Sequence, residues 1–405
     1  MVAPIDVLYV FTARKRRLLA GVAAGTDPDT LLFGLNQLRA DPNHGVSRRE
    51  APSPVAVDFH EPHVAPVARA AMAAVGRLGP DVVQLRTLPH FVGRDVVFLT
   101  GGWPLLFASR LIPAARRPRI VWLNMALLNL LRRGGPRAGV IAGAARLADR
   151  ITCVSVDQQK FLIGRLGLPA SRLPVALNGT DARFFSPTGS GVHAHPPPSP
   201  HAPGGLILPS PHAPGGLSLA SGAQAPADPL VLAAGRDAAR DYRTFAEALA
   251  GTGHRAVVVC SRANLDGVTL PAGVEVRFDV PPATLRDLYG RATVVVVPTR
   301  GDGDPVGSDC SGTLVTLDAL AMGRPVVVTA RASVPEYVTP GVHVTTVPAG
   351  DVAALRLAIN QAISPDPATA KSVADQARAG QAHVRSRRTT DHFAAGIANV
   401  FREVA

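Results

Sequence analysis

The sequence predicts an α/β protein made of two doubly wound halves, each with a parallel sheet covered by helices on both faces. Three observations support this fold class. Short, almost continuously apolar runs alternate with helix-like runs, as in buried parallel strands joined by helices. One segment rich in Pro, Gly, Ser and His, 186–228, interrupts this alternation. The chain has 405 residues, which is long for a single core, and 47% of them are hydrophobic.

The first half of the sequence is predicted to form strands separated by helices. Ile5–Phe11 is apolar and β-branched, as expected of a buried strand. Asp29–Arg39 has helical spacing with an acidic first turn, and His63–Leu78 is Ala-rich and helix-like. Further short strands are predicted at Val96–Thr100, Arg119–Asn124 and Ile151–Ser155.

The second half repeats the alternation after residue 228. The predicted strands are Leu230–Ala234, Ala256–Cys260, Val274–Phe278, Thr293–Val297 and Val326–Thr329. The predicted helices are Tyr242–Ala250, Ala283–Arg291, Thr313–Met322, Asp351–Ile363 and a helical tail from about residue 367. A ligand cleft is expected between the halves, at the carboxyl ends of the strands.

The predicted division has four parts. They are an N-terminal, acceptor-binding domain (1–185), a linker or insertion (186–228), a C-terminal domain (229–365), and C-terminal helices (366–405), the last returning to the N-domain. The insertion contains an eleven-residue repeat, PSPHAPGGLIL (Pro198–Leu208) and PSPHAPGGLSL (Pro209–Leu219). Two copies are too few for a solenoid, so a flexible connection is expected, with a metal-binding tract as the alternative. The histidines of this segment are His193, His195, His201 and His212.

The net charge of +12 is concentrated in the N-terminal part. Residues 1–150 hold 20 Lys and Arg against 10 Asp and Glu. This excess predicts attraction to an anionic membrane or acceptor, or a solvated face, and the Arg/Lys cluster within Phe11–Gly25 is one candidate. Nucleic acid is not expected, since no aromatic residues interleave the arginine clusters. Three scattered cysteines and no apolar run of spanning length predict a cytoplasmic protein, with peripheral membrane contact as an option.

The most informative stretch is Pro298–Gly323, which reads as a small-residue loop running into a helix. The loop Ser308–Thr313 leads directly into that helix, so free N–H groups and the positive end of the helix dipole suit a phosphate. Asp318 lies seven residues after Ser311, on the same helix face, and offers a carboxylate to a neighbouring hydroxyl. Nucleoside diphosphate-sugars carry both groups.

Three segments together resemble the group 1, retaining GT-B glycosyltransferases. Ala148–Pro187 resembles the family's last N-domain strand and helix with an "NG-x-D…F-x-P" crossover. Leu230–Leu249 resembles the "GR…K…L" opening of the nucleotide domain. Pro298–Ile363 resembles "E…LEAMA-x-G-x-PVV" followed by "E-x-V-x-x-G…GD…AL…AI". The resemblance implies two Rossmann-like domains and transfer of a hexose-like sugar from a nucleoside diphosphate-sugar, without a metal or other cofactor.

By this resemblance, Arg236 and Arg240 take the positions of the family's phosphate-binding Arg and Lys. Asp318 takes the place of the carboxylate that holds the ribose hydroxyls, although it is one methylene shorter. Cations at a diphosphate leaving group stabilise the transition state more than the ground state, because charge builds up there.

The resemblance fails at the first Glu of the family's paired-glutamate motif, where Cys310 stands with Asp309 beside it. Two interpretations follow. Either the backbone of Ser311, Gly312 and Thr313, together with Asp309, contacts the sugar, or the site is inactive and only binds a nucleotide-sugar. Cys310 lies at a helix start, where a thiol's pKa can fall, but it has no evident partner base.

Other candidate residues are less specific. No catalytic residue is evident, and the candidates are Asn124, His90 and Asp309. Asn124 and His90 would contact donor or acceptor, with an ordinary loop residue as the alternative for each. Asp302-Gly303-Asp304 has the letters of a metal motif but reads as a loop after a strand. Another GT-B activity, such as a sugar-nucleotide epimerase, remains an alternative, whereas a Schiff-base phosphorylase is disfavoured because no Lys lies in a Gly-rich C-domain loop.

Overall fold

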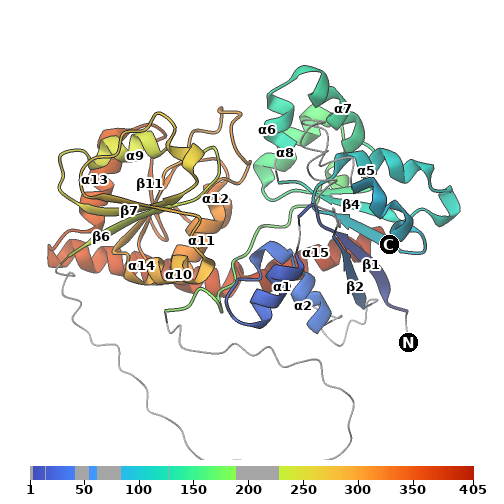
Figure 1. Ribbon diagram of the computed structural model, residues 1–405, viewed down its shortest axis with the longest axis horizontal. Helices are drawn as coiled ribbons and strands as arrows, with labels where there is room; N and C mark the ends of the chain where they lie inside the picture. The colour runs from blue at the N-terminus through green and yellow to red at the C-terminus, as the bar shows by residue number, and fades with distance from the viewer. Residues whose placement is uncertain (1–2, 14, 42–53, 62–83, 126, 188–227) are drawn as a thin grey trace, which may run out of the picture.

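The computed structural model describes residues 3–13, 15–41, 54–61, 84–125, 127–187 and 228–405. These residues form two α/β domains joined by a crossover and by the C-terminal helices (Figure 1). The predicted fold class is therefore confirmed. The predicted helix His63–Leu78 and the four histidines of the insertion lie outside the described residues.

The N-domain is built on a five-stranded parallel sheet in the order β2-β1-β3-β4-β5. The strands are β1 (Ile5–Val10), β2 (Val55–His60), β3 (Val96–Leu99), β4 (Arg119–Leu123) and β5 (Arg150–Thr152). The main helices are α1 (Arg16–Ala23), α2 (Leu35–Ala40), α5 (Trp103–Ala108), α6 (Leu127–Arg132), α7 (Gly135–Ala145) and α8 (Val156–Leu166). Short 3₁₀ turns are η1 (Thr30–Leu32), η3 (Gln84–Phe91), η4 (Ser109–Leu111), η5 (Ala114–Arg116) and η6 (Ala170–Arg172).

The C-domain is built on a six-stranded parallel sheet in the order β11-β10-β9-β6-β7-β8. The strands are β6 (Leu230–Ala234), β7 (Arg255–Cys260), β8 (Val274–Phe278), β9 (Val294–Val297), β10 (Val326–Thr329) and β11 (Thr345–Val347). The helices are α9 (Tyr242–Leu249), η7 (Arg262–Leu265), α10 (Pro282–Arg291), α11 (Thr313–Ala321), α12 (Val334–Tyr337), α13 (Val352–Ala362) and α14 (Pro367–Arg387). The strand order reverses between β6 and β9, which is where a doubly wound sheet opens a crevice for ligands.

Each sheet is buried on both faces, as the continuous apolar runs predict. In the C-domain, Val231 and Ala233 of β6 pack with α9 and α13, whereas Leu232 of the same strand packs with α11. Alternate residues therefore enter two separate cores, one on each side of the sheet. The N-domain sheet is divided between two cores in the same way.

The last helix, α15 (Thr390–Val404), packs on the N-domain sheet. Phe401 contacts Tyr9 of β1 and Phe98 of β3 edge to face, with ring centroids 6.0 and 5.4 Å apart. The chain thus leaves the N-domain once before β6 and returns to it after α14. We propose the same four-part division, 1–185, 186–228, 229–365 and 366–405, for the protein. Within the described segments, no helix combines the length and apolarity that crossing a membrane requires.

The predicted helix Asp29–Arg39 is instead two short pieces, η1 and α2. Phe33 and Gly34 separate them, with positive φ values of 52° and 82°. A Cβ on Gly34 would lie 3.0 Å from the Cα of Ala394 in α15. The break therefore lets the chain pack against the returning C-terminal helix, a contact that local helical spacing does not encode.

The two connections between the domains cross at Gly179. A Cβ there would lie 2.0 Å from the carbonyl oxygen of Thr389, which is backbone and cannot move aside. The backbones of Thr180, Arg388 and Thr390 exchange hydrogen bonds at the same point. The crossing holds the two connections together only because residue 179 has no side chain.

We predict that Gly179→Ala destabilises the protein by about 1–3 kcal/mol, because the added methyl group overpacks a backbone contact. Gly164→Ala is the matched control, since a Cβ added to Gly164 of α8 would meet nothing within 4 Å, and Ala favours helix there. Chemical denaturation of both variants measures the effect. Equal stability of the two variants would contradict the crossing as described.

Candidate functional site

The candidate site lies where the C-domain sheet reverses its strand order, at the carboxyl ends of β6 and β9. Gly235 follows β6 and Thr299 follows β9. Arg240, on the loop between β6 and α9, forms an antiparallel bridge with Thr299. The N-terminus of α11 begins beside them at Gly312, whose φ of 91° favours glycine. The loop predicted to bind phosphate is therefore placed at the switch point of the sheet.

Arg240 is a buried cation, with 5% of its surface exposed. Its guanidinium fits between two glycines: a Cβ on Gly235 would lie 2.2 Å from Nε, and a Cβ on Gly312 would lie 3.2 Å from Nη1. Burial lowers the pKa of Arg240, and nearby Arg331 lowers it further, while Tyr242 and Asp237 act in the opposite direction. Both glycines are thus needed for the guanidinium to reach the start of α11.

Several buried polar atoms around Gly312 have no hydrogen-bond partner in the structure. They are Arg240 Nε and Nη1, Thr299 Oγ1 and Ser311 Oγ. No side chain caps α11. Buried polar groups are normally satisfied, and leaving each one unpaired costs about 1–3 kcal/mol. A cluster of unpaired donors around a helix N-terminus indicates a site prepared for an anion.

The space at this point is divided between a closed pocket and an open groove. The pocket, lined by Ser311, Gly312, Thr313 and Arg331, has a volume of only about 20 Å³, room for one water molecule. The groove on the other side of Arg240 has a volume of about 470 Å³ and includes Arg236 and Arg300. A diphosphate therefore fits the groove as the structure stands, whereas the pocket at α11 must widen to take one.

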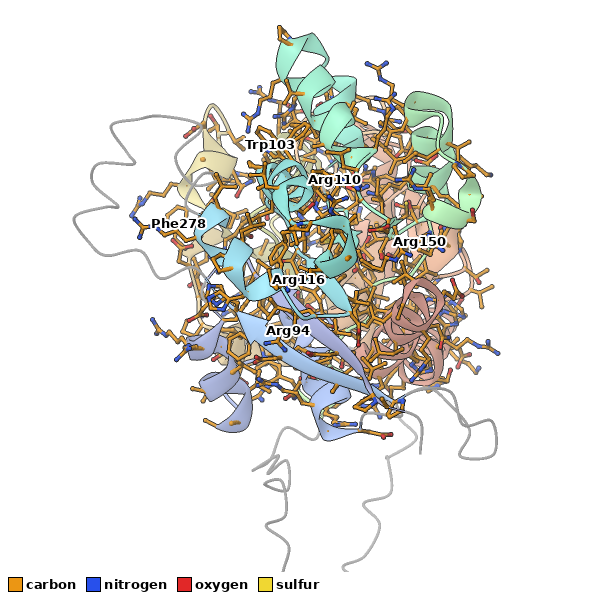
Figure 2. The ribbon with its side chains drawn as sticks, turned by 90° about the vertical axis from the view of Figure 1, so that its right-hand side faces the viewer. Arg94, Trp103, Arg110, Arg116, Arg150 and Phe278 are labelled. Carbon is orange, nitrogen blue, oxygen red and sulfur yellow. The ribbon has the colours of Figure 1, made fainter. Side chains whose placement is uncertain are left out.

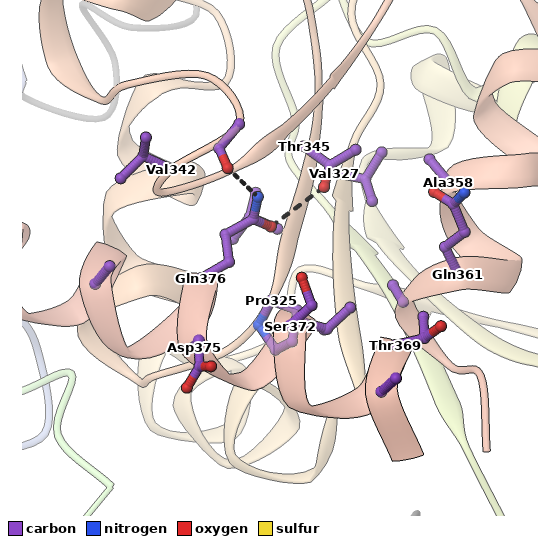
Figure 3. Close-up of a pocket in the computed structure, with 16 residues that line it drawn as sticks. Pro325, Val327, Val342, Thr345, Ala358, Gln361, Thr369, Ser372, Asp375 and Gln376 are labelled. Atoms are coloured by element: carbon purple, nitrogen blue, oxygen red, sulfur yellow. Dashed lines mark hydrogen bonds between the residues drawn. The ribbon is translucent and has the colours of Figure 1, made fainter. Parts of the chain in front are cut away.

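A larger cavity, about 800 Å³, lies at the opposite edge of the C-domain sheet (Figure 3). It is lined by the start of β10 and by α13 and α14, and Gln376 bridges the hydroxyl of Thr345 and the carbonyl of Gly341 across it. It contains none of the predicted site residues.

Arg236 and Arg331 flank the buried Arg240 in different ways. Arg236 lies on the groove, with 61% of its side chain exposed and an ion pair to Asp279 at 3.1 Å. Arg331, which follows β10, is almost buried and is held by Asp302 at 3.0 Å. It also donates to the carbonyls of Asp309 and Ser311. Sequence reasoning missed Arg331; its place two residues after a predicted strand was the available signal.

Asp318 lies on α11 as predicted, but its carboxyl group accepts a hydrogen bond from the hydroxyl of Thr180 in the crossover. Its pKa is raised to about 8, because burial and, to a smaller extent, the charge of Asp181 outweigh the lowering effect of the Thr180 hydrogen bond. At neutral pH Asp318 is therefore largely protonated. The residue links α11 to the interdomain connection in this structure, and its contact with a ribose remains a prediction.

Asp309 does not face the groove. Its carboxylate accepts hydrogen bonds from the backbone N–H groups of Leu128 and Asn129, at 3.1 and 3.0 Å, and from the side chain of Gln158 at 2.6 Å. Burial raises its pKa despite these bonds. Asp309 thus caps α6 of the N-domain from a C-domain loop. Asn124 caps the same helix, its side-chain oxygen accepting from the N–H of Leu127 at 2.7 Å.

Cys310 packs with the apolar residues on one face of the N-domain sheet. Burial raises the pKa of its thiol to about 12, and the charges of Asp309 and Asp237 act in the same direction. A lowered pKa, which the helix start alone suggests, is not found. The thiol is therefore unsuited to be a nucleophile at neutral pH.

The remaining candidates lie apart from this cluster. Asp302 pairs with Arg331, and Asp304 pairs with Arg300, so the two carboxylates face different cations. No group of three metal-ligating side chains occurs among the described residues. His90 stacks against His60, at the carboxyl end of β2 in the N-domain, with ring centroids 4.3 Å apart.

Comparison with known families matches residues 229–364 to the glycosyl transferases group 1 model. The match covers the C-domain, including Arg236, Arg240, the Ser308–Thr313 loop and Asp318. No curated protein matches the chain by sequence.

Comparison with solved structures supports the two-domain GT-B fold over the whole chain. Sucrose-phosphate synthase from Thermosynechococcus elongatus aligns with a TM-score of 0.64 and 16% identity, covering 99% of both chains. Anabaena HepE in complex with UDP-glucose aligns with a TM-score of 0.60 and 14% identity, covering 98% of both chains. A glycosyltransferase from Rickettsia africae aligns with a TM-score of 0.59 and 11% identity, covering 100% of this chain and 99% of that one. At these identities the likeness shows the fold.

We predict that Asp318→Asn makes stability less dependent on pH. Between the pKa of an unfolded Asp, 3.8, and the native value of about 8, the folded protein holds a proton that the unfolded chain has lost. Wild-type stability therefore falls as pH rises through this window, by at most about 1.4 kcal/mol per pH unit. Asn cannot titrate and keeps the Thr180 hydrogen bond.

Thermal unfolding from pH 5 to pH 8 measures this difference, and the wild type is expected to lose stability relative to the variant. Asp287→Asn is the control, because Asp287 is 72% exposed. A constant difference between wild type and Asp318→Asn across this range would show that Asp318 is ionised in the native state.

Proposed function

Since residues 229–364 form a group 1 glycosyltransferase domain, we propose that the protein transfers a sugar from a nucleoside diphosphate-sugar to an acceptor with retention of configuration. The observation that carries this proposal is the buried Arg240, whose unpaired N–H groups lie beside the uncapped start of α11. The donor would lie on residues 229–365 and the acceptor on the N-domain.

The diphosphate is the part of the donor that this chemistry fits best. Arg240 and the N-terminus of α11 offer positive charge and hydrogen-bond donors from a water-poor site, where they act more strongly than in water. Arg236 adds a second, exposed guanidinium at the groove. As the bond between sugar and diphosphate breaks, charge accumulates on the diphosphate, so these groups stabilise the transition state preferentially.

Two structures in the comparison support the same class of donor. Anabaena HepE has been solved with UDP and with UDP-glucose, and its fold spans nearly the whole of this chain. We propose a UDP-sugar as the first donor to test. Thr180 and Asp318 lie together at the crossover, and Asp318 would turn to the ribose when the pocket at α11 widens.

No carboxylate occupies the position where the family's first Glu contacts the sugar. Asp309 is bound by the N-domain, and Cys310 is partly buried against an apolar core of the N-domain. We propose that the backbone around Ser311, Gly312 and Thr313 contacts the sugar instead. The acceptor hydroxyl would attack on the face from which the diphosphate departs, and the departing phosphate would take its proton, so no side-chain base is required. The reaction would need no metal.

The same observation favours a second candidate function, a nucleotide-sugar-binding protein without transferase activity. Such a protein would keep Arg240 and the α11 site but would lack the contact that positions the sugar. Nucleotide binding is common to both proposals, whereas consumption of the donor with an acceptor panel occurs only in the first.

We predict that Arg240→Met weakens binding of UDP by about 10- to 100-fold, because one charge-assisted hydrogen bond to a phosphate is worth roughly 1.5–3 kcal/mol. The melting temperature of the unliganded variant should equal or exceed that of the wild type, because an unpaired buried charge is removed. Titration calorimetry with UDP, GDP, ADP and dTDP, together with thermal unfolding, measures both effects.

Arg291→Met is the matched control, since Arg291 is an exposed arginine at the end of α10. Its nucleotide affinity should equal that of the wild type. If Arg240→Met binds every nucleotide as tightly as the wild type, the anion site lies elsewhere and the proposal fails.

We also predict that the sugar keeps its anomeric configuration and that transfer continues after chelation of divalent metals. Proton NMR of the first-formed product, with and without EDTA, tests both statements. An inverted anomer would rule out retention, and loss of turnover with EDTA, restored by a divalent ion, would rule out a metal-free reaction.

A further inference from the structure

The outer part of the N-domain carries a long stretch of chain without a single acidic residue. Residues 96–148 contain no Asp or Glu. Eight arginines occur there: Arg110, Arg116, Arg117, Arg119, Arg132, Arg133, Arg137 and Arg146. This stretch forms β3, α5, β4, α6 and α7 with their connecting turns. Arg132 and Arg133 face the C-domain, where they donate to the carbonyls of Asp302 and Pro305.

The turn between α5 and β4 exposes large apolar side chains among these arginines. Leu111 is 81% exposed and Phe107 is 42% exposed, and Arg110 and Arg116 are exposed beside them in sequence. Figure 2 looks at this side of the molecule, and Trp103, Arg110, Arg116 and Arg94 are labelled on it. We call Phe107, Arg110, Leu111 and Arg116 the outer face.

Helix α7 extends the outer face. Val140 is 47% exposed, and Arg137, one turn before it, is exposed as well. The two helices are in contact, since a Cβ on Gly143 of α7 would lie 3.8 Å from the ring of Phe107 in α5. Exposed apolar and cationic side chains therefore occur on α7 as well as on α5 and the η4 turn that follows it.

A cavity of about 530 Å³ borders the outer face, lined by Arg94, Arg116, Arg117 and Arg119. Arg117 connects the wall of this cavity to the turn between α5 and β4, because its guanidinium donates to the carbonyls of Arg110 and Ile112. Asp95 also lines the cavity and accepts from the N–H of Asp6, and two of the arginines are paired, Arg94 with Asp6 and Asp58 and Arg119 with Asp149. Arg116 has no such acidic partner among the described residues, so the cavity has an excess of positive charge.

We propose that the outer face docks on an anionic phospholipid membrane. The arginines meet the lipid phosphates, which attract basic residues near the surface of an acidic bilayer. Leu111 and Phe107 enter the boundary between headgroups and acyl chains, where exposed apolar side chains are removed from water. A charged partner without an apolar phase explains the arginines but gives Leu111 nothing to contact.

This surface differs from the Arg/Lys cluster that the sequence singled out near the first strand. There, Glu61 pairs with Arg16 and accepts hydrogen bonds from the backbone of Lys15 and Arg16. The ammonium group of Lys15 also lies over the rings of Phe11 and Phe33. Those contacts hold part of that cluster on the protein. On the outer face, Arg110 donates to the carbonyl of Leu147, whereas Leu111 and Arg116 are exposed.

The surface shares no residue with the donor site, so docking and donor binding are tested separately. Docking is measured by sedimenting the full chain with two kinds of vesicle. One kind contains phosphatidylcholine alone, and in the other about one lipid in three is the anionic lipid phosphatidylglycerol. The wild type should bind the anionic vesicles, bind neutral vesicles weakly, and dissociate from anionic vesicles as salt is raised. Single-stranded DNA serves as an anionic partner without an apolar phase.

Arg116→Glu should weaken binding to anionic vesicles about 10- to 30-fold, since one positive charge is replaced by a negative one. Leu111→Ser should weaken it about tenfold through the lost apolar contact, without changing the affinity for DNA. The matched controls are Arg385→Glu on α14 and Leu357→Ser on α13, because Leu357 is 59% exposed in the other domain. Both controls should bind vesicles as the wild type does.

Thermal unfolding of each variant verifies that it is folded, whether or not the protein binds UDP. Equal vesicle binding by Leu111→Ser and wild type would overturn the proposal, because charge alone would then account for the attraction. Binding to DNA but not to anionic vesicles would overturn it in favour of a nucleic-acid partner.

Discussion

The arrangement of the two domains depends on two C-domain carboxylates that cap helices of the N-domain. Asp309 accepts from the first N–H groups of α6, and Glu336 accepts from the backbone of Val156 and Asp157 at the start of α8. A carboxylate at a helix N-terminus satisfies donors that have no partner within the helix and meets the positive end of its dipole. Tyr337 adds a third link, donating to Val154 and accepting from the N–H of Asn178. Asp309 and Glu336 each hold the start of an N-domain helix, and Tyr337 holds Val154 and the crossover residue Asn178.

These contacts also determine the state of the candidate site. The loop that carries Asp309 continues through Cys310 to Gly312 and α11, so capping α6 places the start of α11 as well. Asn129 donates to the carbonyl of Gly307 in the same loop. With the loop held in this way, the pocket at α11 is nearly closed, while Arg240 is left buried and unpaired. Burial of this unpaired guanidinium destabilises the unliganded protein, and an anion bound at the site would offset that destabilisation by pairing with it. If the loop moves when the pocket widens, the contact of Asp309 with α6 must change, and the proposed donor binding would then be coupled to the domain interface.

The sequence predicted the strands and helices that are marked by a pattern of apolar residues within the segment itself. Continuous apolar runs identified most of the strands, since a strand buried on both faces has no other pattern. The three-residue β11 and the partly exposed β2 were missed because neither presents such a run. The helix predicted at Asp29–Arg39 broke at Gly34 to accommodate α15, a contact between residues far apart in the chain. At the site, Arg240 and the start of α11 come together as the motif spacing suggested. The partners of Asp309 and Asp318 could not be predicted, because Gln158, Leu128 and Thr180 approach them only after both domains have folded.

The replacement of a motif Glu by Cys310 is best understood together with its neighbour. At position 310 the side chain packs into the apolar face of the N-domain sheet, where a carboxylate would be buried without partners at a cost of several kcal/mol. At position 309 the carboxylate finds three donors from α6 and α8. The acidic group next to α11 therefore serves the domain interface, and its raised pKa indicates that even these bonds only partly offset its burial. A sugar held near α11 has the backbone of the Ser311 turn and the guanidinium groups of Arg240 and Arg331 as its nearest polar surroundings. In the proposed reaction, recognition of the sugar would then rest on backbone and guanidinium groups rather than on a carboxylate, with the N–H groups of Ser311 and Thr313 already donating to the carbonyls of Ser308 and Cys310.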